Sequence, residues 1–310
     1  MIIINSAYLD LFSSGELEKR VEKAYDILKD CKLCPHHCHV DRTKNETGYC
    51  QIGKEIIVAS FAPHYGEEAP LVGNLGSGTV FFSSCNLKCI YCQNYDISHL
   101  REGSIVTVKE LGKILIDLQN KGCHNINFVT ASHMIHAVLA SILEACKEGL
   151  KIPIVYNTGA YDDIEALKLL DGVVDIYLPD IKYSDENIAL KYSKISNYIE
   201  IVKKAVKEMH RQVGDLKIEG GIAKKGLIVR HLVLPENLAG TKEVMDFISK
   251  DISEDTYLNI MDQYYPAYKA IDHDILNRRI SREEYKEVLE IAEKAKLKRV
   301  INHDDLFTKL

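Results

Sequence analysis

The chain has 310 residues, of which 46% are hydrophobic and 27% are charged, and its formal net charge is −6. This length suffices for one large barrel or two modest domains with a sizeable core. The acidic balance disfavours a broad nucleic-acid-binding surface, and no apolar run reaches the roughly 18 residues that a membrane-spanning helix needs. We therefore expect a globular protein with no membrane span and no nucleic acid partner.

The first residues are apolar but lack the basic region and the cleavage pattern of a signal peptide, so we expect a cytoplasmic protein. Nine cysteines in such a chain indicate metal or cluster ligation in preference to disulfides. Seven of the nine form two groups along the sequence. The other two, Cys123 and Cys146, are expected to be buried as small hydrophobic side chains.

An amphipathic helix is predicted over Glu16–Asp30, with a capping box of Ser13 and Glu16 at its start. It leads into four cysteines at the spacing C-x2-C-x3-C-x11-C, which are Cys31, Cys34, Cys38 and Cys50. Four thiolates this close along the chain are typical of a metal site. Zinc in a closed tetrahedral site and a second iron–sulfur cluster both fit, and the spacing does not choose between them. A neighbouring histidine replacing one cysteine is a less favoured ligand set.

A strand is predicted over Glu55–Phe61, followed by a loop with two adjacent carboxylates, Glu67 and Glu68. Side chains of adjacent residues usually point apart in extended backbone, so we expect a solvated or capping role for this pair. We assign residues 1–75 to an N-terminal extension that carries the helix and a cysteine-rich metal-binding knuckle. Residues 76–310 form the main domain.

From residue 79 onward, apolar strands alternate with helical segments. The predicted strands are Thr79–Phe82, Asn125–Val129, Ile154–Tyr156, Val174–Leu178, Leu227–Leu234 and Tyr257–Met261. The predicted helices are Val108–Lys121 with a Thr107/Glu110 capping box, Met134–Glu148, a helix capped by Asp162 and Glu165 that runs to Leu170, Asp185–Val213 in two pieces broken near Ser196 and Asn197, Thr241–Ile252, and Arg282–Ala295 with a Ser281/Glu284 box. This alternation predicts an α/β fold with a parallel sheet and helical crossovers, and six strands are too few for a closed eight-stranded barrel.

The most informative motif comes directly after the first of these strands. Cys85, Cys89 and Cys92 have the spacing C-x3-C-x2-C. A dedicated four-ligand zinc site needs a further donor close by, whereas an iron–sulfur cluster can be held by three thiolates with one iron left open. The motif therefore indicates an iron–sulfur cluster.

The stretch from Gly76 to Asn94, with Tyr91 beside the last cysteine, resembles the radical S-adenosylmethionine (SAM) superfamily, in particular the branch related to pyruvate formate-lyase activating enzyme. The resemblance implies a partial (β/α)6 TIM-type barrel and a [4Fe–4S] cluster on Cys85, Cys89 and Cys92. SAM would chelate the open iron through its amino and carboxylate groups. Cysteine-rich N-termini accompany this branch.

The implied reaction is reductive. A reduced cluster passes one electron to SAM, and the resulting 5′-deoxyadenosyl radical abstracts a hydrogen atom from a substrate. An electron donor such as flavodoxin or ferredoxin is then a partner. By analogy the substrate is a glycine of a protein; a small molecule or another protein residue is the alternative, and a non-catalytic iron–sulfur or zinc protein is the rival class. Many activating enzymes carry a cysteine insert after the cluster loop, and residues 93–108 have none.

In βα barrels the site forms at the carboxyl ends of the strands, and polar residues follow each predicted strand here. The candidates for SAM binding are Ser132, Asn157, Asp180, Lys182 and Arg230. The family often has Gly-Gly-Glu after its second strand to meet the SAM amino group. Thr130-Ala131-Ser132-His133 replaces it, which leaves that contact to Ser132, to backbone carbonyls or to His133.

The remaining candidates are weighed against simpler roles. Asp180 and Lys182 resemble an Asp-x-Lys whose lysine faces the methionine carboxylate, although an exposed ion pair in a loop is the alternative. Asn157 fits a polar SAM-binding position, or turn chemistry alone. Arg230 lies in an apolar strand, and a buried guanidinium needs a partner. No catalytic residue is assigned.

Overall fold

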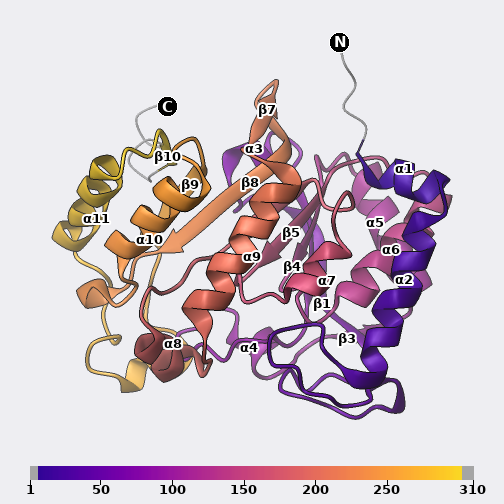
Figure 1. The fold of residues 1–310 in the computed structure, drawn as a ribbon, viewed down its shortest axis with the longest axis horizontal. Coiled ribbons are helices and arrows are strands. Elements are labelled where there is room, and N and C mark those ends of the chain that lie inside the picture. The colour runs from indigo at the N-terminus through magenta and orange to yellow at the C-terminus, as the bar shows by residue number, and fades with distance from the viewer. Residues whose placement is uncertain (1–5, 302–310) are drawn as a thin grey trace.

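The chain folds around one β-sheet in which most neighbouring strands are parallel (Figure 1). The structure is a computed structural model that describes residues 6–301. Within that range the strands are β1 (Ile56–His64), β2 (Ser77–Phe82), β3 (Ser104–Val106), β4 (Ile126–Val129), β5 (Ile154–Thr158), β6 (Ile176–Pro179), β7 (Lys217–Glu219), β8 (Ile222–Leu232), β9 (Tyr257–Met261) and β10 (Arg299–Ile301). Their order across the sheet is β10-β9-β8-β6-β5-β4-β2-β1-β3, and β7 pairs with β8.

The predicted strands correspond to β2, β4, β5, β6, β8 and β9, and each is parallel to the next. β10 adds a further parallel strand at one edge, while β1 runs antiparallel to β2 at the other. The predicted α/β fold, a partial barrel of parallel strands, is confirmed. Every residue of β4, β5 and β6 is buried, as expected for parallel strands that are covered on both faces.

The helices of the described range surround the sheet. They are α1 (Tyr8–Ser13), α2 (Glu16–Ile27), α3 (Ala69–Val72), α4 (Tyr95–Ser98), α5 (Val108–Asn120), α6 (Ile135–Lys147), α7 (Ile164–Lys168), α8 (Glu186–Ser193), α9 (Tyr198–Val213), α10 (Thr241–Phe247) and α11 (Arg282–Lys294). α2 packs beside α6, which in turn packs against α5 (Figure 1). In residues 6–301 no helix has the length and apolar character to cross a membrane.

Helix starts were predicted with mixed success. The capping boxes at Thr107 and Ser281 are present, and the long helical segment breaks at Asn197, as predicted. The box at the start of α2 is wrong: its N-cap is Gly15, with a left-handed φ of 74°, and the Ser13 hydroxyl donates to a carbonyl within α1. The helix α7 is capped by Asp163 in place of Asp162.

The N-terminal extension is joined to the main domain along its length. β1 forms part of the sheet, and Cys31–Cys50 form loops next to the carboxyl end of β2. The division at residue 75 stays a prediction. Because β1 is antiparallel to β2, His64 at its end pairs with Ser77 at the start of β2. The loop after β1 therefore begins at the amino ends of the parallel strands.

Candidate functional site

The loop that follows β2 is held in place by hydrogen bonds to backbone carbonyls of several other segments. Ser84 has a left-handed φ of 68°, and its hydroxyl donates to the carbonyl of Cys50 in the extension. The amides of Lys88 and Ile90 donate to carbonyls at the end of α8, over 3.1 and 2.9 Å. The three-cysteine loop is therefore fixed between the N-terminal extension and α8.

The sulfur atoms of this loop face hydrogen-bonding groups and line one cavity of about 340 Å³. The Leu87 amide donates to Cys85 Sγ over 3.3 Å. Ser193 Oγ lies 2.9 Å from Cys89 Sγ, and Ser98 Oγ lies 3.1 Å from Cys92 Sγ. Such groups stabilise thiolate charge, which suits the predicted role of the three cysteines as ligands of an iron–sulfur cluster.

Burial favours the neutral thiol at two of these cysteines. It raises the pKa of Cys85 to about 12 and that of Cys89 to about 11, although Lys182 opposes the shift at Cys89. Ligation by a metal replaces the thiol proton, so loading of the site releases protons.

A buried charge network lies across the cavity from the cysteines. Arg230 in β8 contacts three side chains: Nε is 2.6 Å from Asp180 Oδ1, Nη2 is 2.7 Å from Asn157 Oδ1, and Nη1 is 3.1 Å from Glu67 Oε2. The Arg230 side chain is 15% exposed. The predicted need for a partner is met by two carboxylates and one amide, and all four residues line the cavity.

Lys182 extends the network toward the cysteines. Its Nζ lies 2.9 Å from Asp180 Oδ2, and its amide donates to the Tyr198 hydroxyl over 2.7 Å. The Lys182 side chain is 16% exposed, so the alternative of an exposed loop pair is wrong. Burial disfavours the charged form of Asp180, but Arg230 and Lys182 outweigh it and hold its pKa below the usual value.

The carboxylates of Glu67 and Glu68 are buried, contrary to the solvated or capping role predicted for them. Their loop begins at the amino end of the sheet, yet Glu67 reaches Arg230 and lines the cavity. Asn259 donates to Glu68 Oε1 over 2.8 Å, and Glu68 caps no helix with its side chain. Burial raises the pKa of Glu67 to about 7, against the opposing effect of Arg230. The one sequence feature that indicated the Glu67–Arg230 contact was an arginine in an apolar strand, which needs a partner.

The segment after β4 contributes less side-chain surface than predicted. Thr130 lines the cavity, whereas Ser132 and His133 are buried outside its lining. The Ser132 hydroxyl lies 3.1 Å from Thr158 Oγ1, which donates to Asp162. His133 Nε2 donates to the Ser83 carbonyl over 3.0 Å, and burial lowers the pKa of His133 to about 3. Asn157, Asp180, Lys182 and Arg230 are therefore brought together, and Ser132 is not.

The four cysteines of the extension lie close to one another in loops outside the sheet. The Tyr49 amide donates to Cys38 Sγ over 3.2 Å, and a Cβ at Gly48 would lie 2.5 Å from that sulfur. Burial raises the pKa of Cys34, and the other three cysteines are near enough to add to the shift. In residues 6–301 no three His, Cys, Asp or Glu side chains converge closely enough for a single metal ion, either here or in the three-cysteine loop.

The histidines of this knuckle have partners other than the sulfurs. His36 Nε2 lies 2.8 Å from the Asn86 carbonyl, inside the three-cysteine loop. His37 pairs with Asp163 and His39 with Asp30. The knuckle therefore contacts the cluster loop through His36 as well as through the Cys50–Ser84 hydrogen bond. Cys123 and Cys146 are buried as predicted.

A parallel partial barrel with three cysteines after its first parallel strand defines an enzyme class. The chain belongs to the radical SAM superfamily, whose family model matches residues 79–248. Membership implies a [4Fe–4S] cluster, SAM and radical chemistry, as predicted.

The individual proteins that this chain resembles do not define its reaction more closely than the superfamily does. The chain is 37% identical over 298 residues to an uncharacterized protein of Methanocaldococcus jannaschii, covering 93% of this chain and 82% of that protein. It is 32% identical over 133 residues to the pyruvate formate-lyase-activating enzyme of Clostridium pasteurianum, covering 40% of this chain and 53% of that enzyme. Among solved structures, HydG, a maturase of the [FeFe]-hydrogenase, aligns with 70% of this chain and 49% of its own, at 14% identity and a TM-score of 0.49.

Replacing Arg230 with methionine is expected to destabilise the apoprotein strongly. The change removes one of the two cations beside Asp180 and the donor to Glu67, and breaking a buried pair in this way typically costs about 3–5 kcal/mol. Urea unfolding followed by circular dichroism measures the free energy of unfolding. Arg211→Met is the matched control, because Arg211 also pairs with two carboxylates but has a 56% exposed side chain. Its loss should cost about 1 kcal/mol or less, and equal losses for the two variants would contradict the role given to Arg230.

The raised pKa of Glu67 predicts a pH-dependent stability. Between the ordinary glutamate pKa of 4.5 and about 7, the folded protein keeps a proton that the unfolded chain has released. Wild type should therefore lose stability relative to Glu67→Gln as pH rises through this window, by at most about 1.4 kcal/mol per pH unit. Unfolding at a series of pH values measures the difference. Glu165→Gln, at an exposed position of α7, should follow the wild-type slope; a flat difference for Glu67→Gln refutes the assignment.

Proposed function

We propose that the chain is a radical SAM enzyme that abstracts a hydrogen atom from a glycine of a partner protein, as an activating enzyme does. The observation that carries the proposal is the single cavity shared by Cys85, Cys89, Cys92 and the Arg230 network. The partial similarity to a pyruvate formate-lyase-activating enzyme supports the choice of substrate class.

The three cysteines fit the cluster that the family implies. Each sulfur has a nearby N–H or O–H group, from Leu87, Ser193 or Ser98, that can compensate thiolate charge. When bound and reduced, the cluster supplies one electron to SAM, whose sulfonium C–S bond then breaks into methionine and a 5′-deoxyadenosyl radical.

The charge network is suited to hold the carboxylate of SAM. Arg230 and Lys182 carry two positive charges, Asp180 carries one negative charge, and burial keeps Glu67 largely protonated below about pH 7. Both cations line the cavity and can face an anionic group of the ligand. We assign Lys182 to the methionine carboxylate, and Asn157 and Asp180 to polar contacts that Arg230 positions.

The contact with the SAM amino group is assigned to backbone carbonyls near Thr130. This residue has a left-handed φ of 59° and lines the cavity, whereas the hydroxyl of Ser132 and the ring of His133 are bonded elsewhere. The sequence lacks the family's Gly-Gly-Glu at this place, so a carbonyl acceptor replaces the missing carboxylate.

The four cysteines of the knuckle are proposed to hold a second metal group, either zinc or an iron–sulfur cluster. Their short spacing along the chain and the separate partners of the three neighbouring histidines support a ligand set of Cys31, Cys34, Cys38 and Cys50. Iron, sulfide and zinc analysis of anaerobically purified protein separates the two metals.

Substitution of one cluster cysteine is expected to abolish SAM cleavage. Cys89→Ala removes a sulfur from the cavity, and the reconstituted, dithionite-reduced variant should form no 5′-deoxyadenosine from SAM. Cys146→Ala is the control, because Cys146 is buried in α6 and far from the motif in sequence. Chromatographic assay of 5′-deoxyadenosine gives the result. Equal product from wild type and Cys89→Ala, or none from a fully loaded wild type, would overturn the proposal.

The substrate class is tested by isotope transfer. Reaction with pyruvate formate-lyase that carries α,α-dideuterated glycine should place deuterium in 5′-deoxyadenosine and produce a glycyl-radical EPR signal. The same protein with ordinary glycine is the control for background. SAM cleavage without deuterium transfer would reject this glycine substrate and favour a small molecule or another protein residue.

A further inference from the structure

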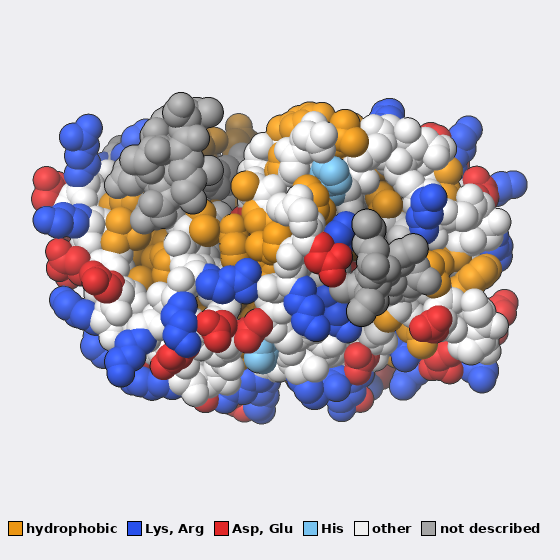
Figure 2. Space-filling model, turned by 90° about the horizontal axis from the view of Figure 1, so that it is seen from above, with side chains coloured by type: hydrophobic (Ala, Val, Ile, Leu, Met, Phe, Trp, Pro, Cys, Tyr) orange, Lys and Arg blue, Asp and Glu red, His pale blue; other side chains and the backbone are white. Residues whose placement is uncertain are grey.

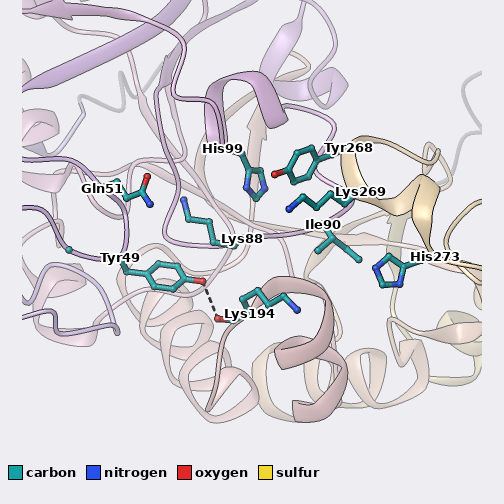
Figure 3. Close-up of a pocket in the computed structure, with 10 residues that line it drawn as sticks. Tyr49, Gln51, Lys88, Ile90, His99, Lys194, Tyr268, Lys269 and His273 are labelled. Atoms are coloured by element: carbon teal, nitrogen blue, oxygen red, sulfur yellow. Dashed lines mark hydrogen bonds between the residues drawn. The ribbon is translucent and has the colours of Figure 1, made fainter.

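A second cavity, of about 650 Å³, lies on the outer side of the three-cysteine loop and is open to solvent. Its side chains include three lysines, and none of its lining residues is Asp or Glu. We call it the basic depression, and the residues that define it are Tyr49, Lys88, His99, Lys194, Tyr268 and Lys269. Figure 3 shows Lys88 and Lys269 on either side of His99, with Tyr268 beside Lys269. By contrast, basic and acidic side chains are interspersed over the face of the molecule shown in Figure 2.

The basic depression is assembled from segments that are distant in sequence and bonded to one another. The Tyr49 hydroxyl of the extension donates to the Lys194 carbonyl over 3.0 Å. The Lys269 amide donates to the Ile90 carbonyl over 2.9 Å. The ring of Tyr268 lies 4.5 Å from that of His99. These contacts preform the backbone and the rings of the surface, so a partner that binds there meets a fixed framework that carries the three lysines.

Only one layer of residues separates this surface from the cluster cysteines. Lys88 directly precedes Cys89, and His99 Nε2 donates to the Cys89 carbonyl over 3.0 Å. His99 lines both the basic depression and the inner cavity that contains the sulfurs. On the opposite wall, Tyr49 directly precedes Cys50 of the knuckle. The basic depression therefore lies between the two cysteine groups.

We propose that the basic depression is the docking surface for a small acidic electron-transfer protein, an inference that rests on the proposed function. Each SAM cleaved takes up one electron, which a one-electron donor loses as the sulfonium C–S bond breaks. SAM and substrate occupy the inner cavity, so the donor must approach the cluster from outside, and this surface offers the His99–Cys89 hydrogen bond as a short connection.

Charge complementarity selects an acidic partner. The chain as a whole has a net charge of −6, which repels an acidic protein at long range. The basic depression has three lysines and no carboxylate in its lining, so it attracts an acidic donor locally. An acidic donor is therefore steered to this surface and repelled by the rest of the molecule. The glycine substrate, in contrast, must reach the inner cavity.

The test compares a protein donor with a chemical one. The double variant Lys194→Glu/Lys269→Glu reverses two charges at the rim without touching the cavity that contains the sulfurs. With reduced flavodoxin as donor, its KM for flavodoxin should rise by at least about tenfold, and the wild-type rate should fall with added salt. With dithionite as donor, 5′-deoxyadenosine formation should match wild type.

The control carries the same two changes elsewhere. Lys113→Glu/Lys217→Glu reverses exposed charges on α5 and β7, and β7 lies at the opposite end of the molecule from α4 and α8 (Figure 1). It should leave the KM for flavodoxin at the wild-type value. An equal rise of KM in both double variants would indicate a general charge effect and overturn the docking surface. Loss of the dithionite reaction in the rim variant would place the lysines in the fold or the site and also overturn it.

A binding measurement keeps this inference separate from the proposed function. Oxidised flavodoxin and oxidised ferredoxin, titrated against the metal-loaded protein, should bind wild type with a Kd at least about tenfold lower than the rim variant shows. Saturable binding with no SAM cleavage by dithionite would reject the proposed function and retain the docking surface. Wild type that binds neither donor, or inorganic phosphate that binds in place of both, overturns the docking surface.

Discussion

The guanidinium of Arg230 is the charge on which the site depends. It is removed from water inside the sheet, and its cost is offset by hydrogen bonds to Asp180, Asn157 and Glu67, which come from three separate segments. Because one planar fork fixes all three partners, the carboxyl ends of β5 and β6 and the loop after β1 are held in register with β8. Lys182 then takes its position from Asp180. The charged side chains of the cavity are therefore held in one arrangement by the hydrogen bonds of a single cation, Arg230.

A second constraint comes from the N-terminal extension, which acts on the cysteine loop from outside. The Cys50 carbonyl accepts from Ser84, and His36 lies against the Asn86 carbonyl, so both ends of the loop's first turn are tied to the knuckle. The buried Arg42 adds a further tie, because it donates to the His133 carbonyl over 2.8 Å. The knuckle therefore supports the two loops that face SAM in the proposed function, and a metal bound there would stiffen both.

The sequence predicted features that depend on local pattern. Strand and helix alternation, the two capping boxes at Thr107 and Ser281, and the cluster loop all follow from residues close together in the chain. Arg230 was expected to need a partner, but which residue supplies it depends on tertiary structure. Glu67 could not be found because its loop enters the barrel from the end opposite to that expected for functional residues.

Adjacent polar residues were the other source of error. Asp162 and Asp163 are equivalent as helix caps by sequence, yet Asp162 accepts from the Tyr156 and Thr158 hydroxyls, which leaves Asp163 to cap α7. Ser132 was a reasonable candidate by its place after β4, but the backbone at Thr130 turns its hydroxyl toward Thr158. A shift of one residue in a loop decides which side chain faces a cavity. The hydrophobic periodicity of the sequence does not predict that choice, because loops have no regular repeat.

The contacts of the knuckle also set an order of events during synthesis. Tyr49 bonds to the Lys194 carbonyl, 145 residues further along the chain, and Arg42 bonds to a carbonyl 91 residues further. At about 5–20 residues per second, the ribosome needs roughly 7 to 30 s to add the 145 residues between the first pair. For that time the four cysteines of the knuckle have emerged without the surface that later covers them. In the proposed function, metal binding at these cysteines can therefore begin before the barrel is complete, and until then their thiols are open to oxidation.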